Sequence, residues 1–184
     1  MWEKGHVSGT PYGFDPAKVR AAQRAAGLTL DRLAELAGLT DRAVRQYLAE
    51  SRTPRPSALV GIARALGVDA AQLCTAEPEA IHHLRIFTGR CRDTMAAALG
   101  IPSGAYRRLE VSGERTRFVS NRYCHAQHRW MPWFEWAPAV FEVTPERLRA
   151  AERHTRESCR TGRQEDAPHS RSDETDPWTG KSTP

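Results

Sequence analysis

The sequence predicts an all-α protein with two small helical domains in tandem. Three observations lead to this prediction. Helix-start and helix-stop residues alternate at short intervals, apolar residues recur with the 3.6-residue period of a helix, and part of the first half reappears in the second. We expect a flexible arm over residues 1–14, a first domain over 15–76, a second domain over 77–151 and a disordered tail over 152–184.

The first domain is expected to contain five short helices, over residues 17–26, 30–37, 41–49, 58–66 and 69–73. Residues that favour the N-cap position precede four of them, and glycines that favour the left-handed conformation follow three. The expected caps are Asp15, Thr29, Thr40 and Ser57, and the expected stops are Gly27, Gly38 and Gly67. Five helices in about 60 residues form a complete small all-α unit.

The third expected helix has two distinct faces. Val44, Tyr47 and Leu48 follow helical spacing and are expected to be buried. The outward residues are Asp41, Arg42, Arg45 and Gln46. Arg and Gln pair bidentately with guanine and adenine edges, so this face is a candidate for reading DNA bases. An ordinary solvated helix face is the alternative interpretation.

Residues 28–73 resemble the helix-turn-helix domain of the lambdoid phage repressor (Xre) family. The matching residues are Thr29, Leu33, Ala34, Gly38, Leu39, Thr40, Val44, Tyr47, Pro54, Ile62, Ala63, Leu66, Gly67, Val68 and Leu73. The resemblance implies that residues 41–49 form the recognition helix in the major groove, with Asp41, Arg42 and Gln46 at its base-reading positions. Three residues depart from the pattern: Leu48 stands where the family usually has Glu, Glu50 where it often has Gly, and Leu30 where it often has Gln.

The charge of the chain suits a polyanionic partner. Its formal net charge is +5, its pI is near 9.3, and arginines far outnumber lysines. A GC-rich genome would explain the arginine excess equally well. The expected phosphate-binding residues are Thr29, Thr40, Arg52, Thr53, Arg55, Arg115 and Arg117.

The second domain contains an altered copy of the first. Within residues 95–115, MAAALGIPSGAYRRLEVSGER, all but the unmatched last residue align with residues 33–52 at an offset of 62, and the offset grows to 75 at residues 141–148. The difference corresponds to a 13-residue insertion after the second candidate recognition helix, residues 103–111. Its expected base-reading residues are Ser103, Arg107 and Arg108. This copy is either a second DNA reader, which the arginine pair favours, or a decayed copy kept for dimerisation.

The insertion and the residues after it are aromatic and basic. Trp133, Trp136, Ala137, Val140 and Phe141 follow the spacing of a buried helix face, so we expect them in the core. Tyr123 and Trp130 could cover that core or form a surface for a partner. Cys124, His125 and His128 lack the spacing of a zinc finger, so we predict no metal, and we expect the four cysteines to be free thiols.

The sequence therefore predicts a sequence-specific protein for double-stranded DNA, most simply a transcriptional regulator, acting as one chain or as a homodimer. The alternative is an antitoxin-like or plasmid and phage maintenance module whose Trp-rich second domain binds a protein partner. No catalytic motif is present, so we predict neither an enzyme nor a cofactor. Without a signal peptide or a membrane-spanning run, we expect a cytoplasmic protein, associated with the nucleoid when bound to DNA.

Overall fold

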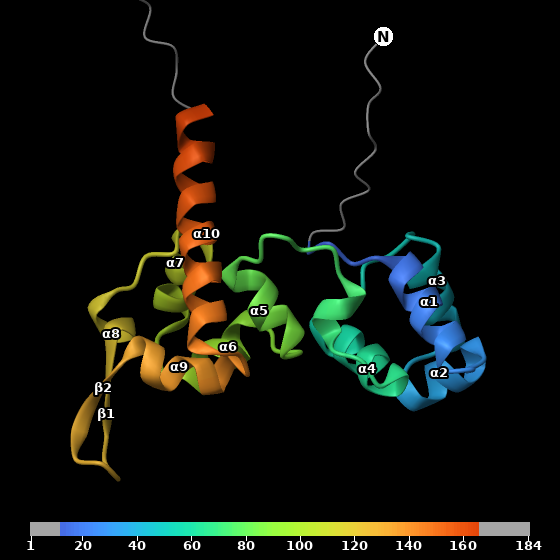
Figure 1. Cartoon of the computed structure of the whole chain (residues 1–184), viewed down its shortest axis with the longest axis horizontal. Helices are drawn as coiled ribbons and strands as arrows, with labels where there is room; N and C mark the ends of the chain where they lie inside the picture. Colours follow the sequence, from blue (N-terminus) through green and yellow to red (C-terminus); the bar gives the residue numbers. More distant parts are fainter. Residues whose placement is uncertain (1–11, 166–184) are drawn as a thin grey trace, which may run out of the picture.

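The computed structural model of the chain describes residues 12–165, and these form two helical lobes side by side (Figure 1). Most of the expected arm and the end of the expected tail lie outside the described residues. The described end of the arm is not loose. Tyr12 and Phe14 are buried, and Thr75 donates its N–H to the carbonyl of Gly13 at 2.6 Å. The expectation of a flexible arm is therefore wrong for residues 12–14, because two aromatic side chains complete the core of the first lobe.

The first lobe contains the five expected helices. They are α1 (Pro16–Ala25), α2 (Leu30–Ala37), α3 (Asp41–Leu48), α4 (Pro56–Leu66) and the 3-10 helix η1 (Ala70–Leu73). Asp15, Thr29 and Thr40 accept backbone N–H groups as N-caps. The expected cap at Ser57 is wrong: α4 begins at Pro56, whose missing N–H needs no partner, and Arg55 occupies the N-cap position without a side-chain hydrogen bond.

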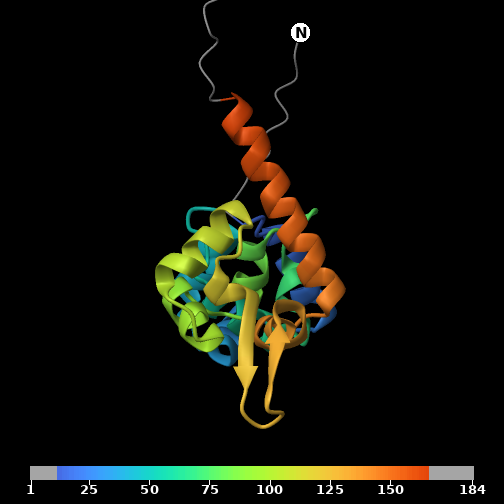
Figure 2. The same cartoon turned by 90° about the vertical axis from the view of Figure 1, so that its left-hand side faces the viewer.

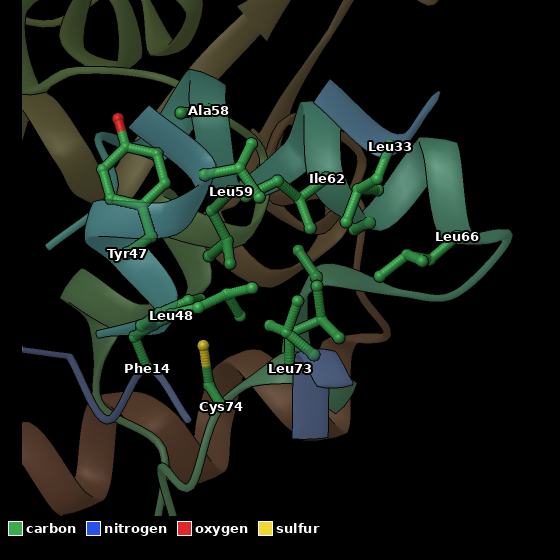
Figure 3. Close-up of a cluster of buried hydrophobic side chains, with 14 of the residues drawn as sticks. Phe14, Leu33, Tyr47, Leu48, Ala58, Leu59, Ile62, Leu66, Leu73 and Cys74 are labelled. Carbon is green, nitrogen blue, oxygen red and sulfur yellow. The ribbon is translucent and has the colours of Figure 1, made fainter. Parts of the chain in front are cut away.

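The core of the first lobe lies between α2, α3 and α4 (Figure 3). Leu33, Leu59 and Ile62 are almost completely buried there. Gly61 lets α4 approach α2 closely, because a Cβ atom at this position would lie 2.8 Å from the carbonyl oxygen of Ala37. Val44, Tyr47 and Leu48, which helical spacing predicts to be buried, belong to the same core.

The second lobe combines helices with a small β-hairpin. Its elements are α5 (Ile81–Phe87), α6 (Arg92–Leu99), α7 (Ser103–Ser112), α8 (Arg117–Ser120), β1 (Asn121–Cys124), β2 (Arg129–Pro132), α9 (Trp133–Phe141) and α10 (Pro145–Glu165). The 13-residue insertion corresponds to α8 and the antiparallel β1–β2 hairpin, in which Tyr123 pairs with Trp130. The all-α expectation is wrong at this hairpin, which projects from the lobe in Figures 1 and 2.

The expected disordered tail is also wrong for residues 152–165, which belong to α10. Leu148, Ala151, Glu152 and Thr155 are buried and lie on one face of this helix. The hydroxyl of Thr155 accepts the N–H of Ile81 at 3.0 Å and so ties α10 to the start of α5. Helical spacing of apolar residues does not reveal the buried face of α10, because two of the buried residues on it are polar. The second domain therefore continues past residue 151.

The aromatic core of the second lobe agrees with the sequence prediction. Trp133, Trp136, Ala137 and Phe141 are buried, and the ring of Trp133 meets those of Trp136 and Phe141 edge-on at centroid distances of 5.0 and 6.3 Å. Val140 is only partly buried against this core. Three of the four large aromatic or aliphatic side chains on this face are thus core residues, which removes them from any partner surface.

Candidate nucleic-acid interface

The turn between α2 and α3 fixes the direction of α3. Gly38 adopts the left-handed conformation at φ 66° and ψ 33°, and Leu39 donates its N–H to the carbonyl of Ala34 at 2.8 Å. Thr40 then caps α3 by accepting the N–H of Ala43 at 3.2 Å. Because Val44, Tyr47 and Leu48 are buried, the opposite face of α3 is left to solvent.

The outward face of α3 carries the four expected base-reading residues, and its two arginines differ in whether they form ion pairs. Arg42 is exposed and has no ion-pair partner among the described residues. Arg45 pairs with Asp41 at 2.7 Å and approaches Asp31 at 3.8 Å. The hydrogen bond from Arg45 lowers the pKa of Asp41. Gln46 is half-buried on the same face. Arg42 is therefore available to a ligand without breaking a contact, whereas Arg45 has to leave two carboxylates.

The expected phosphate-binding residues of the first lobe surround α3. Thr29 and Thr40 are exposed at the starts of α2 and α3, where their oxygens accept the cap hydrogen bonds and their hydroxyl protons stay free to donate. Arg52 and Arg55 are exposed in the loop between α3 and α4, and Thr53 is half-buried there. Polar donors therefore flank both ends of α3, as contacts to a sugar-phosphate backbone would require.

The turn between α6 and α7 has the same glycine conformation and the same backbone hydrogen bond as the first turn. Gly100 has φ 66° and ψ 33°, the values of Gly38, and Ile101 donates its N–H to the carbonyl of Ala96 at 3.0 Å. Each residue lies 62 positions after its counterpart. Pro102 takes the place of the capping Thr40, so α7 starts without a side-chain cap.

The outward face of α7 is less rich in side chains than that of α3. Arg107 and Arg108 are exposed, and neither has an ion-pair partner within the described part of the chain. Ser103 is exposed and donates its hydroxyl to Asp93 at 3.1 Å. Gly104 lies open to solvent with no neighbour around its missing side chain. The face can present two guanidinium groups, and no charged residue on it opposes them.

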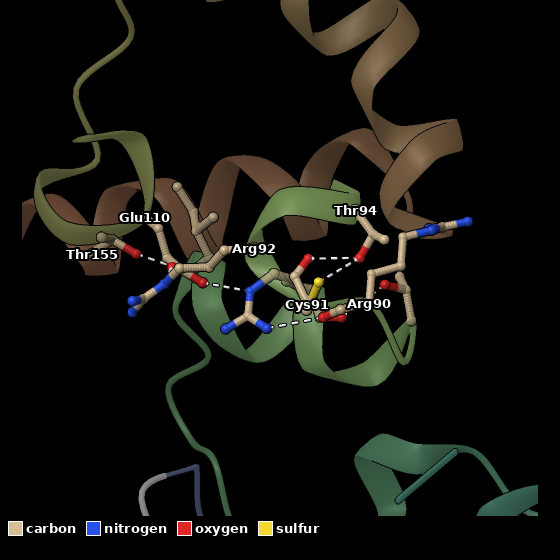
Figure 4. Close-up of polar contacts among 9 residues, drawn as sticks. Arg90, Cys91, Arg92, Thr94, Glu110 and Thr155 are labelled. Atoms are coloured by element: carbon tan, nitrogen blue, oxygen red, sulfur yellow. Dashed lines mark hydrogen bonds and ion pairs between the residues drawn. The ribbon is translucent and has the colours of Figure 1, made fainter. Parts of the chain in front are cut away.

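A buried ion cluster holds α7 in place and was not predicted from the sequence (Figure 4). Glu110 is buried and accepts the Nε–H of Arg85 at 2.7 Å and that of Arg92. Arg85 is itself only 8% exposed and also donates to the carbonyl of Arg90. The signal in the sequence was Glu110 itself, an acidic residue aligned with the apolar Leu48. A buried carboxylate requires cationic partners.

The two predicted phosphate contacts of the second lobe lie after α7. Arg115 donates to the buried Glu152 at 3.0 Å, and its guanidinium carbon lies 4.9 Å from the centre of the Phe134 ring. Arg117 is exposed at the start of α8. Arg115 therefore has a structural role beside any contact with a ligand, because it joins the loop after α7 to α10.

The two outward-facing helices lie on the same side of the molecule. In Figure 1, α1 lies in front of α3, and α10 lies in front of α7. Figure 2, seen from the end of the second lobe, places α7 and α10 on opposite sides of it. Both α3 and α7 therefore lie toward the far side of the molecule in the view of Figure 1.

Other kinds of site have little support in the part of the chain that the structure describes. No group of three His, Cys, Asp or Glu residues there could hold a metal ion, and His125 instead contacts the ring of Tyr123. The four cysteines are free thiols, as expected. Across residues 12–165, no helix has both the length and the apolar composition needed to cross a membrane.

Comparison with known proteins identifies the first lobe. Residues 19–73 match the helix-turn-helix family. The match covers α2, the turn at Gly38 and α3, so the geometry described above is similar to that of a helix-turn-helix domain. The comparisons with curated proteins and with solved structures found no match.

Proposed function

We propose that the protein is a sequence-specific transcriptional regulator that reads double-stranded DNA through α3 and, as a second copy of the same domain, through α7. The proposal is carried by the exposed Arg42 and the half-buried Gln46, which share the outward face of a helix fixed by the Gly38 turn inside a helix-turn-helix match. These side chains are those that pair bidentately with guanine and adenine in the major groove.

The repeated turn supports a role in DNA binding for the second lobe. The backbone hydrogen bonds around Gly100 match those around Gly38, and the arginines at 107 and 108 occupy the positions of Arg45 and Gln46. Two readers in one chain would occupy two half-sites about one helical turn, roughly 10 base pairs, apart. A homodimer would then cover a longer operator.

The test begins with selection of bound duplexes from a random DNA pool, followed by affinity measurements on the selected site. Arg42→Ala and Gln46→Ala should each weaken binding by about 1–3 kcal/mol and relax preference at one base pair. Arg55→Ala should weaken binding to every sequence alike and reduce the dependence on salt. Unchanged affinity and preference in both α3 variants would show that α3 is not the recognition helix.

One observation favours the second candidate function, an antitoxin-like or maintenance module that binds a protein partner. Trp130 is 66% exposed and Tyr123 is 37% exposed on the same face of the β1–β2 hairpin, with ring centroids 5.5 Å apart. Exposed aromatic pairs are typical of protein interfaces. Affinity purification of wild type and Trp130→Ala would test this function, which predicts a stoichiometric partner that the variant loses.

A further inference from the structure

A hollow of about 600 Å³ lies where the end of α7, the α8 segment and α10 meet. A second hollow of about 210 Å³ shares Arg115 and Arg156 with the first. Figure 2 looks onto this end of the second lobe. The two hollows together are lined by five arginines, Arg115, Arg149, Arg153, Arg156 and Arg160, and by two acidic residues, Glu114 and Glu152.

Two of these arginines are held in fixed positions. Glu152 is only 2% exposed, and the same carboxylate oxygen accepts Arg115 at 3.0 Å and Arg156 at 2.5 Å. Arg156 also donates to the carbonyl of Gly113 at 3.0 Å. One carboxylate therefore faces two guanidinium groups, and one positive charge stays uncompensated. The side chains of Arg115 and Arg156 are 31% and 37% exposed, so their remaining N–H groups can still meet a ligand.

Two of the other three arginines add to this charge, whereas Arg149 is paired with Glu146 at 3.3 Å. The guanidinium carbons of Arg115 and Arg149 lie 4.9 and 4.8 Å from the centre of the Phe134 ring, which places the two cations against one aromatic side chain. Arg153 and Arg160 are exposed and have no ion-pair partner among residues 12–165. Like charges brought this close repel each other unless an anion enters between them.

We propose that this hollow is a binding site for a phosphate-bearing anion, with Arg115, Arg156 and Arg160 as its main donors. The planar guanidinium fork matches phosphate oxygens bidentately, and positions set by Glu152 reduce the entropy lost on binding. The volume suits a group larger than one phosphate. The phosphate could belong to a free phosphorylated compound or to the DNA backbone beside α7, and only the second source rests on the proposed function.

The experiment uses the full chain and the double variant Arg153→Gln/Arg160→Gln, which removes two charges and no ion pair. Arg24→Gln/Arg64→Gln, two exposed positions of the first lobe, removes the same charge elsewhere. Calorimetric titration with pyrophosphate at constant ionic strength should give saturable binding to wild type and to the control pair. The Arg153/Arg160 variant should bind at least tenfold more weakly.

A second arm titrates the selected DNA duplex over a range of salt concentrations. If the hollow takes backbone phosphates, the Arg153/Arg160 variant loses affinity for all sequences alike and its log–log salt slope falls by about 1–2. Pyrophosphate binding with unchanged DNA affinity identifies a free phosphorylated ligand instead. The proposal is overturned if the variant behaves as the control pair in both arms. Failure of both Arg42→Ala and Gln46→Ala to affect DNA binding would remove the proposed function while leaving the pyrophosphate result intact.

Discussion

The helical hairpins α2–α3 and α6–α7 have the same turn but stabilise it with different chemistry. Leu48 of α3 packs into an apolar core, whereas Glu110, 62 residues later, is buried in an ion cluster with Arg85 and Arg92. Leu48 is 7% exposed and Glu110 is 4% exposed. In both hairpins the side chain at this position is buried. An apolar side chain is stable there when its neighbours are apolar, and a carboxylate is stable when its neighbours are cationic.

The outward faces of the two hairpins differ in how far their arginines are restrained. Arg45 of α3 is bound by Asp41 and Asp31, whereas Arg107, its counterpart in α7, has no ion pair among the described residues, and Ser103 replaces Asp41. Gly104 in turn replaces Arg42. The outward face of α3 thus has one arginine without an ion pair and one arginine in an ion pair. The outward face of α7 has two arginines without ion pairs and, at Gly104, no side chain.

The largest expected effect concerns the buried ion cluster. Glu110→Ala leaves Arg85 buried without its carboxylate and should lower the free energy of unfolding by about 3–5 kcal/mol. Arg85→Met/Glu110→Leu, which gives α7 an apolar anchor like that of α3, should recover most of this loss. Denaturant unfolding followed by tryptophan fluorescence measures both, because residues 15–76 contain no Trp. A double variant as unstable as the single one would show that the turn of α7 needs the charges.

The next largest effect is the loss of DNA affinity when Arg107 or its counterpart Arg45 is replaced. If α7 contacts DNA, Arg107→Ala should weaken binding by about 1–3 kcal/mol. Arg45→Ala should weaken it by less, since Arg45 gives up contacts with Asp41 and Asp31 to reach DNA. Fluorescence anisotropy on the selected duplex measures both changes. Normal binding by both Arg107→Ala and Arg108→Ala would assign DNA reading to the first lobe alone.

A smaller effect tests whether the two turns are equivalent. Gly38→Ala and Gly100→Ala should each destabilise the protein by about 1–2 kcal/mol, because both glycines have φ 66° and neither has a neighbour near the missing Cβ. The control is Gly104→Ala, which lies inside α7 and should stabilise it by about 0.5–1 kcal/mol. Thermal unfolding of the three variants compares them directly, and clearly unequal costs at positions 38 and 100 would argue against equivalent turns.

The smallest effect is a dependence on pH that originates at His83 in the second lobe. Burial, with a smaller contribution from His82, lowers the pKa of His83 to about 4, and its Nδ1 accepts the N–H of Ala80 at 2.9 Å. The unfolded chain, with a pKa near 6.5, therefore takes up the proton first as the pH falls. Stability should be full above about pH 6.5 and should fall toward pH 4, by about 1 kcal/mol for this partly exposed ring.

His83→Asn isolates this contribution, because an Asn oxygen can accept the same N–H and does not titrate. Urea unfolding at pH 7 and pH 4.5 should show a smaller loss of stability on acidification in the variant than in wild type. The same loss in both proteins would assign the acid sensitivity to other groups.

Local signals account for the success of sequence reasoning in the first lobe. Each N-cap, each left-handed glycine and each apolar spacing there acts within a few residues, and α1 to η1 follow these signals closely. Ser57 is the exception, because Pro56 takes the first helical position before a cap at 57 can act. The candidate residues on α3 followed from the same periodicity.

In the second lobe, several features depend on contacts between residues far apart in the sequence, which local sequence signals do not indicate. The continuation of α10 depends on Thr155 contacting Ile81, 74 residues away, and the position of Arg115 depends on Glu152, 37 residues away. Neither pair shows any spacing that a sequence pattern could reveal. The β1–β2 hairpin was missed because its strands have only four residues each, too few for a clear alternation.

By itself, the sequence determined the helices of the first lobe, the face of α3 and the repeat at Gly100, since these depend on neighbours along the chain. Only the tertiary structure decided that Glu110 is buried with two arginines and that α10 completes the second lobe. It also decided that five arginines line two adjoining hollows. The reason is that the free energy of a buried charge or a packed polar helix depends on partners that folding brings from distant positions.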